Sequence, residues 1–336
     1  MIRVFVVDDS AFVRKALRRV LSADPEVTVV GEAASGPEAV LRIPEAAPDV
    51  VTLDVEMQGL DGLQVLRQLL AWNPALHVIM LSAHTHEGAE ATVEALALGA
   101  ADFIDKQSLS LMDLDRLGRE LGERLRALRR RAPLPRAAPP RLEQQAPDLT
   151  GPELCVIGAS TGGPAALQYL LEQLPTDFPL PIAIVQHMPP GFTRPFANRL
   201  NGLCRLRVSE AVEGDQLRAG RVLIAPAGMH LRISRGLAAT LSADAAGARH
   251  VPSVDVLFRS AERARPGKVL GVLLTGMGED GAEGLSLIRA HGGVTIAESE
   301  ATCAVYGMPR AAVDRGAARH VLPLPAIGAA LAALGS

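Results

Sequence analysis

Short strand-like runs alternate with amphipathic helical stretches along most of this chain, and this alternation restricts the fold more than any other feature. Before residue 129 the strand-like runs are RVFVVDD, VTVVGEA, DVVTLDV, HVIMLSA and ADFIDK, and stretches such as FVRKALRRVLSAD and GLQVLRQLLAW lie between them. Strands that alternate with helices form parallel sheets with helices on both faces. The sequence therefore predicts an α/β fold.

The alternation is interrupted once, by a segment rich in proline, arginine and alanine. This segment begins RRRAPLPRAAPPRLEQQ at residue 129 and is typical of an extended linker. A chain of 336 residues also suits two domains, each able to bury its own core. We therefore expect one domain over 1–128, a linker over 129–152, and a second domain over 153–336.

The second domain resumes the alternation with the runs ELCVIGAS, PIAIVQHM and KVLGVLLTG, each followed by helical sequence. Between residues 206 and 241 the pattern changes and predicts antiparallel hairpins. The second domain is therefore expected to be α/β with an antiparallel insertion.

Composition excludes several classes of protein. Hydrophobic residues make up 48% of the chain, but no apolar run approaches the length that crosses a bilayer, and the start MIRVFVVDD does not resemble a secretory signal. A net charge of −3 and 3% aromatic residues provide no basic stacking surface for nucleic acid. Three widely spaced cysteines suggest neither a disulfide framework nor a zinc site. We expect a cytoplasmic protein that neither enters membranes nor binds nucleic acid.

Charged and hydroxyl residues stand where the predicted strands of the first domain end: Asp8, Asp9, Asp54, Ser82 and Lys106. Ligands of doubly wound sheets bind outside the carboxyl ends of the strands. Three carboxylates in one place repel one another unless a hard cation such as Mg²⁺ neutralises them. One carboxylate could then attack a phosphoryl group whose oxygens Lys106 and the Ser82 hydroxyl stabilise.

With these residues in place, residues 2–126 resemble the receiver domain of bacterial response regulators, through the motifs VVDDS, TLDVEMQGLDGL, LSAHT and GAADFIDK. The resemblance implies a flavodoxin-like doubly wound fold in which a histidine kinase phosphorylates Asp54. It further implies that Asp8, Asp9 and Asp54 bind Mg²⁺ together with the Glu56 carbonyl, and that Ser82 and Lys106 sense the phosphoryl group.

The segment LCVIGASTGGP places Ser160 and Thr161 between glycines, after a strand and before helical sequence. A phosphate-binding loop would need a lysine beside these glycines, and their spacing does not fit a dinucleotide fingerprint. Two interpretations remain open for Ser160, a helix cap and a nucleophile. His187 and Asp280 follow neighbouring strand-like runs, so Ser, His and Asp could converge on one crevice as a catalytic triad.

Several motifs bring a second resemblance, to the chemotaxis protein-glutamate methylesterase (CheB) family. They are IGASTGGP, QHMPPGFT, APAG, PSVDVLFRSA, LLTGMGEDGAEGL and YGMPRAAV. The resemblance implies a Ser160–His187–Asp280 triad, an oxyanion-binding amide from Met277 and an assisting Thr161. It implies a hydrolase, activated by phosphorylation, that demethylates methyl-glutamates of chemoreceptors and deamidates receptor glutamines. The esterase site would need no cofactor, and the protein would be recruited to receptor arrays.

Two other functions remain open on the residues alone. The triad residues would also suit a serine hydrolase acting on a small-molecule ester. However, GASTG does not fit the G-x-S-x-G pattern, and the order Ser, His, Asp differs from that of the common small-ester hydrolases. A non-catalytic binding module controlled by phosphorylation is the second alternative, and an intact set of Ser160, His187 and Asp280 argues against it.

Overall fold

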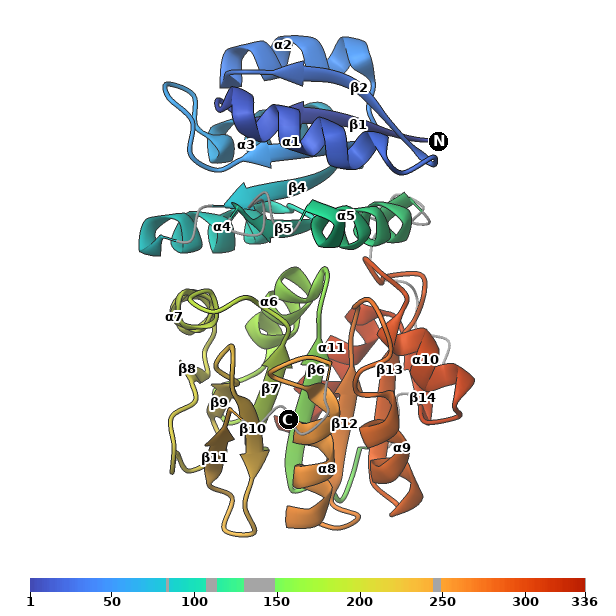
Figure 1. The fold of residues 1–336 in the computed structure, drawn as a ribbon. Coiled ribbons are helices and arrows are strands. Elements are labelled where there is room, and N and C mark those ends of the chain that lie inside the picture. Colours follow the sequence, from blue (N-terminus) through green and yellow to red (C-terminus); the bar gives the residue numbers. More distant parts are fainter. Residues whose placement is uncertain (83–84, 107–113, 130–148, 244–248, 336) are drawn as a thin grey trace. The chain divides into compact units, whose positions relative to one another are not determined.

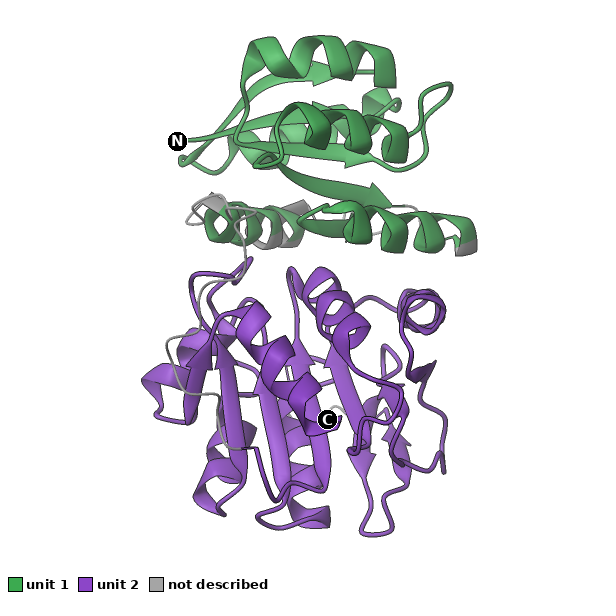
Figure 2. Ribbon diagram, turned by 180° about the vertical axis from the view of Figure 1, so that it is seen from behind, with its two compact units in different colours: residues 1–134 green, residues 135–336 purple. Residues whose placement is uncertain are grey.

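The structure is a computed structural model that describes residues 1–82, 85–106, 114–129, 149–243 and 249–335. Its contacts divide the chain into two units, Met1–Leu134 and Pro135–Ser336 (Figure 2). Most of the expected linker lies outside the described residues, so the expected domain boundaries stay a proposal. Among the described residues, no helix combines the length and the apolar composition that crossing a bilayer requires.

The first unit contains a five-stranded parallel sheet in the order β2-β1-β3-β4-β5 (Figure 1). This order is that of the flavodoxin-like doubly wound fold. The strands are β1 (Ile2–Val7), β2 (Val27–Ala33), β3 (Val50–Asp54), β4 (His77–Ser82) and β5 (Asp102–Asp105). The helices are α1 (Ala11–Ser22), α2 (Gly36–Ala46), α3 (Gly62–Trp72), α4 (His86–Leu98) and α5 (Leu114–Arg129).

Side-chain caps fix where the first four of these helices begin. Ser10, Ser35, Asp61 and Thr85 each accept a hydrogen bond from a backbone amide in the first turn of the helix that follows. At α3 the bond is reciprocal, because Gln64 also accepts from the backbone amide of Asp61 in a capping box. Three of these caps fix the beginnings of α1, α3 and α4, the helices that follow β1, β3 and β4, whose carboxyl ends carry the charged and hydroxyl residues.

The second unit is built on a seven-stranded sheet in the order β14-β13-β12-β6-β7-β9-β8, with every neighbouring pair parallel. The strands are β6 (Leu154–Ala159), β7 (Ile182–Gln186), β8 (Arg207–Glu210), β9 (Arg221–Ile224), β12 (Val269–Leu273), β13 (Val294–Glu298) and β14 (His320–Leu322). The helices are α6 (Gly163–Gln173), α7 (Thr193–Leu203), α8 (Val254–Ala264), α9 (Ala282–Ala290), α10 (Met308–Asp314) and α11 (Leu324–Ala332), followed by a 3₁₀ turn, Ala333–Gly335.

The expectation of antiparallel hairpins over residues 206–241 is wrong for half of that segment. Only β10 (His230–Ile233) and β11 (Ala239–Ser242) form an antiparallel hairpin, whereas β8 and β9 join the main sheet in parallel. The run VLI in β9 is buried throughout, as in a strand covered on both faces, and does not alternate as a half-exposed hairpin strand would. The α/β class itself is confirmed.

Strand order places the two halves of the main sheet on either side of β6. The chain proceeds outward from β6 through β7 to β8 and β9, and later returns to build β12, β13 and β14 on the other side. A switch of direction of this kind opens a crevice at the carboxyl ends of the two strands that flank it. The crevice between β6 and β12 is therefore where the fold favours a binding site.

Helices α8 and α9 pack closely over one face of this sheet (Figure 1). Phe258 of α8 is fully buried in a core with Leu285 and Ile288 of α9 and with side chains of β6, β7 and β9. The close approach requires Gly284, because a Cβ atom at that position would lie 2.6 Å from the Phe258 Cβ. The start of α8 is thereby fixed beside the loop that precedes α9.

We predict that Gly284→Ala lowers the stability of the second unit, by about 1–3 kcal/mol, because the new methyl group has no space at the α8–α9 contact. Gly202→Ala is the matched control, since Gly202 is also helical and has no atom within 4 Å of the added Cβ. Both tyrosines, Tyr169 and Tyr306, lie in this unit and the only tryptophan lies in the other. Urea unfolding followed by the near-UV tyrosine signal therefore reports the second unit, and equal midpoints for the two variants would contradict the prediction.

Candidate functional site

Three adjacent strands of the second unit bring the expected triad residues to one edge of the sheet. Ser160 directly follows β6 and His187 directly follows β7, while Asp280 lies in the loop between β12 and α9. Because β12, β6 and β7 are neighbours in a parallel sheet, their carboxyl ends meet at the same edge, which flanks the switch in strand order. The structure thus places all three residues at the crevice that the topology predicts.

Ser160 occupies a tight turn and is not a helix cap. Its backbone amide donates to the Thr275 carbonyl at 3.0 Å, and its carbonyl accepts from the Gly163 amide at 2.8 Å. The N-cap of α6 is Gly162, with φ of 77° and no side-chain cap. A side chain at Gly162 would be strained by that φ and would meet Ala304, so glycine is required there. The cap interpretation of Ser160 is therefore wrong.

Asp280 joins His187 to the beginning of α8. Its Oδ2 lies 2.8 Å from His187 Nε2 and accepts the Val254 amide at 2.8 Å. Its Oδ1 accepts the Asp255 amide at 3.1 Å and the Ser253 hydroxyl at 2.9 Å. Each carboxylate oxygen thus accepts a backbone amide of a helix N-terminus, and Oδ2 is also bonded to His187.

These contacts determine the charge of Asp280 and the tautomer of His187. Burial alone would raise the pKa of Asp280, but hydrogen bonds from His187 and from the Val254 and Asp255 amides outweigh it and lower the pKa to about 2. An ionised carboxylate can only accept hydrogen bonds, so His187 Nε2 carries the hydrogen that it donates to Asp280. In the neutral ring, Nδ1 is then the nitrogen able to take a proton.

Gln186, a residue that the sequence did not point to, connects the backbone of Ser160 to that of His187. Its side-chain Nε2 donates to the Ser160 carbonyl at 2.9 Å and to the His187 carbonyl at 3.0 Å. The residue is only 1% exposed, and its Oε1 lies against Gly163, where a Cβ atom would be 2.0 Å away. A glutamine ending the apolar strand IAIVQ was the one available signal.

Two further residues beside the triad were not expected from the sequence. Ser253 is the N-cap of α8 and accepts the Val256 amide while its hydroxyl donates to Asp280. A serine immediately before the amphipathic stretch VDVLFRSAERA could have predicted that cap. The His250 ring stacks on the His187 ring with centroids 4.4 Å apart, a contact between distant residues that no local pattern indicates.

Thr161 directly follows Ser160 in the sequence, and Met277 lies in the loop between β12 and α9. Thr161 is buried, and its carbonyl accepts the Thr275 hydroxyl at 2.9 Å. Gly276, directly before Met277, packs so closely on Ser160 that an added Cβ would be 2.8 Å from the Ser160 Cβ. The β12–α9 loop therefore contacts the Ser160 turn, while the chemical roles expected for Met277 and Thr161 stay proposals.

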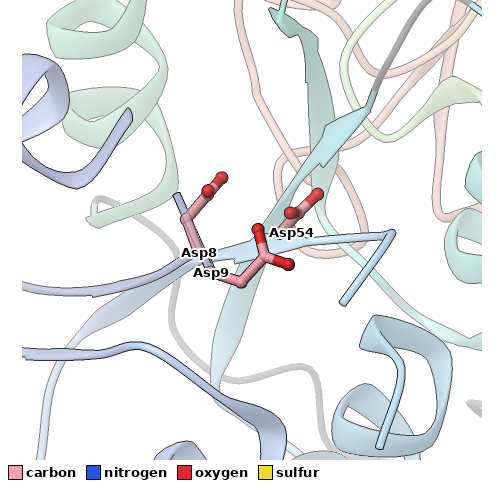
Figure 3. A group of neighbouring side chains, drawn as sticks. All are labelled: Asp8, Asp9 and Asp54. Atoms are coloured by element: carbon pink, nitrogen blue, oxygen red, sulfur yellow. The ribbon is translucent and has the colours of Figure 1, made fainter. Parts of the chain in front are cut away.

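In the first unit, the carboxyl groups of Asp8, Asp9 and Asp54 gather at the ends of β1 and β3 (Figure 3). Each offers an oxygen within 4.8 Å of the others, and Asp8 and Asp54 are buried. Lys106 Nζ lies 2.8 Å from Asp8 and 2.6 Å from Asp54. Burial and the Asp8 charge raise the pKa of Asp54 to about 6 although Lys106 opposes the change. This crowding of buried carboxylates fits a hard divalent cation, which prefers oxygen ligands.

Ser82 lies at the end of β4 and is fully buried. Its hydroxyl donates to the Gly88 carbonyl of α4 at 3.1 Å and accepts from the Thr92 hydroxyl at 2.7 Å. Ser82 is therefore connected to the first turns of α4, whereas Lys106 contacts the carboxylates. The structure places the expected residues of the first unit at four neighbouring strand ends.

The low pKa of Asp280 predicts a pH dependence of stability. A carboxyl group whose native pKa is about 2, against an ordinary 3.8, stabilises the fold above about pH 4 and loses that effect as the pH falls toward 2. Asp280→Asn should therefore lower the free energy of unfolding at neutral pH. It should also lose less stability than the unmodified protein between pH 4.5 and 2.5, by about 1.5 kcal/mol.

Urea unfolding of the two proteins over this pH range, with the exposed Asp177→Asn as control, measures the difference. Parallel pH profiles for Asp280→Asn and the unmodified protein would show that the carboxylate is not held as described.

Comparisons with known proteins relate both units of the chain to known families. Residues 155–331 match the family model described as CheB methylesterase, and residues 4–115 match the response regulator receiver domain. A protein-glutamate methylesterase/protein-glutamine glutaminase of Symbiobacterium thermophilum is 45% identical over 350 residues, which cover 98% of this chain and 96% of the relative. A protein of the same name from Pseudomonas aeruginosa is 47% identical over 339 residues, with 98% and 96% covered.

Among solved structures, the CheB methylesterase catalytic domain of Thermotoga maritima is 40% identical. It aligns with a TM-score of 0.53 over 55% of this chain and 98% of that domain. Both resemblances noted from the motifs are thus confirmed. The relatives match over nearly the whole chain, receiver unit included, and the chain therefore belongs to the CheB methylesterase family.

Proposed function

We propose that this chain is a protein-glutamate methylesterase that is activated by phosphorylation and also acts as a protein-glutamine glutaminase. One observation carries the proposal: the His187–Asp280 pair lies beside Ser160 at the switch point of the sheet, in a chain nearly half identical to relatives of that name. Residues 1–128 would form the receiver, 129–152 a linker and 153–336 the esterase domain. Membership of this family favours a protein substrate over a small-molecule ester.

In the acylation step, His187 Nδ1 takes the proton of the Ser160 hydroxyl as its oxygen attacks the γ-carbonyl carbon of a methylated glutamate. Asp280 remains ionised and stabilises the imidazolium that forms. The tetrahedral intermediate collapses, the C–O bond to methoxide breaks, and His187 returns the proton so that methanol leaves. The substrate glutamyl group is then esterified to Ser160.

In the second step, a water molecule attacks the Ser160 ester while His187 Nδ1 takes its proton. Collapse of this intermediate breaks the bond to Ser160 Oγ, which recovers the proton, and a free glutamate side chain is released. A glutamine side chain follows the same steps with ammonia in place of methanol. We assign the amide of Met277 to the oxyanion, with Thr161 assisting, because Gly276 packs directly against Ser160.

The receiver would regulate the esterase activity through phosphorylation of Asp54. Asp54 attacks the phosphorus of a phosphohistidine on a histidine kinase, and the P–N bond breaks. Asp8, Asp9 and Asp54 would hold a Mg²⁺ ion with the Glu56 carbonyl, and the bound ion would balance negative charge on the phosphoryl oxygens. Lys106 pairs with the phosphoryl group on Asp54. Ser82, which bonds Gly88 of α4, transmits the effect of phosphorylation to that helix.

This function defines the partners and the place of action. The substrates would be methylated chemoreceptors and the phosphodonor a chemotaxis-type histidine kinase, both reached from the cytoplasm at receptor arrays. Neither nucleic acid nor insertion into the membrane has a part in it.

The triad can be tested by methanol release from methylated receptors. Ser160→Ala and His187→Ala should reduce the rate to the detection limit, because each removes an atom that forms or breaks a bond. Asp280→Asn should reduce the rate by a factor on the order of 10⁴, since it disturbs the tautomer of His187. Ser286→Ala, a serine of α9 that bonds only its own helix, is the control. Methanol release by a folded Ser160→Ala variant at the unmodified rate would refute the mechanism.

Phosphorylation control is tested with the intact chain, Mg²⁺ and a small-molecule phosphodonor. Phosphodonor should increase methanol release by about 5–150-fold in the unmodified protein and not at all in Asp54→Asn. Asp61→Asn is the control, because asparagine also caps a helix and Asp61 lies outside the acidic group. Stimulation that persists in Asp54→Asn, or with all Mg²⁺ chelated, would show that the acidic group has another role.

A further inference from the structure

A pocket of 440 Å³ is lined in part by Asp280. One face of α8 forms its wall with side chains spaced four residues apart, Asp255, Arg259 and Arg263. The opposite wall comes from the loop and first turn around α9, through residues 278–280 and Glu283. Arg232 of β10 and the Arg249–His250 segment complete it. The proposed function assigns no role to this pocket.

The acidic residues of the pocket are already satisfied. Glu283 pairs with Arg259 at 2.5 Å, and Glu279 pairs with Arg315 at 2.9 Å. Asp255 accepts the Gly284 amide at 2.6 Å, and burial raises its pKa. Asp280 is held by His187 and the start of α8. Among the residues that the structure describes, none of these carboxylates forms an ion pair with Arg232, Arg249 or Arg263.

Three guanidinium groups of the pocket have no carboxylate partner among the residues that the structure describes. Arg232 donates to the neutral Ser242 hydroxyl, and Arg249 and Arg263 form no ion pair within the described part of the chain. The four arginines and four carboxyl groups of the lining cancel in formal charge. The carboxyl groups already accept hydrogen bonds or ion pairs from the protein, so the groups left to bind a ligand are guanidinium groups. Guanidinium groups bind carboxylates with paired, charge-assisted hydrogen bonds.

His250 connects this pocket to the reacting groups. Its ring lines the pocket and stacks on the ring of His187 with an interplanar angle of 22°. Asp280 likewise lines the pocket and bonds to His187. Only the His250 side chain would separate a ligand group bound to the arginines from His187, the general base. Two neighbouring side chains of one substrate could therefore occupy the pocket and the reaction site together.

We propose that this arginine pocket binds carboxylate side chains of the polypeptide substrate that flank the methylated glutamate. The proposal rests on the proposed function and names the class of substrate, an acidic polypeptide segment. Each turnover itself converts a neutral ester into a carboxylate, so a segment with several such glutamates becomes more acidic as it is processed. The pocket would then retain the segment while successive esters are hydrolysed.

Two synthetic peptides can test the role of the pocket independently of the esterase function. Each carries one γ-methyl glutamate, flanked by glutamates in the first peptide and by alanines in the second. The full-length protein should hydrolyse the acidic peptide with about tenfold higher kcat/KM, and 0.5 M NaCl should largely abolish this preference because salt screens exposed charges. In the double variant Arg249→Gln and Arg263→Gln, kcat/KM for the acidic peptide should fall to that of the neutral peptide.

The neutral peptide should be hydrolysed by the double variant within about twofold of the unmodified rate, which shows that the triad is intact. Arg218→Gln, an exposed arginine of the same unit outside the pocket, should keep the preference. Equal kcat/KM for both peptides in the unmodified protein, or a preference that persists in the double variant, would refute the proposed role of the pocket. Neither result would contradict the esterase function. If neither peptide released methanol, both the proposed esterase function and the proposed role of the pocket would be refuted.

A third arm addresses a free anion as the natural occupant. If the pocket served a small anion, inorganic phosphate would change the hydrolysis of both peptides equally and no preference for flanking glutamates would exist. We expect phosphate to inhibit only hydrolysis of the acidic peptide, and to have no effect in the double variant.

Discussion

The organisation of the second unit depends on one largely buried carboxylate, that of Asp280. Asp280 accepts hydrogen bonds from a histidine that follows β7, from a serine hydroxyl and from two amides at the start of α8. These partners come from two separate segments of the chain, residue 187 and residues 253–255, so a single side chain of a third segment fixes their relative positions. The helix N-terminus also provides positive potential that keeps the carboxylate ionised despite its burial.

This arrangement links substrate recognition to chemistry through α8. Its first turn holds Asp280, while later turns of the same helix present Arg259 and Arg263 to the pocket. The helix is in turn fixed by the Gly284 contact with α9 and by the buried Phe258. A small change at the α8–α9 contact would therefore be expected to affect both the orientation of His187 and the position of the arginines.

Local patterns were enough to predict much of this structure. Alternating strands and helices predicted both parallel sheets, and residues at strand ends identified Ser160, His187 and the acidic group, because chain direction in a parallel sheet brings those ends together. The parallel course of β8 and β9 was missed, since pairing depends on distant strands. For Asp280 the sequence suggested the acid of a triad. The structure shows that Asp280 also accepts the Val254 amide of α8, 26 residues earlier, while it bonds His187. No local spacing reveals this combination.

The most direct test of this account is the protonation of the two His187 ring nitrogens, observed by ¹⁵N NMR of the full chain and assigned by loss of the signals in a His187→Gln variant. At a pH where the ring is neutral, hydrogen bonding to an ionised Asp280 requires the hydrogen on Nε2 and none on Nδ1. The account predicts this tautomer in the unmodified protein and its loss in Asp280→Asn. A hydrogen on Nδ1 with Nε2 unprotonated in the unmodified protein would contradict it.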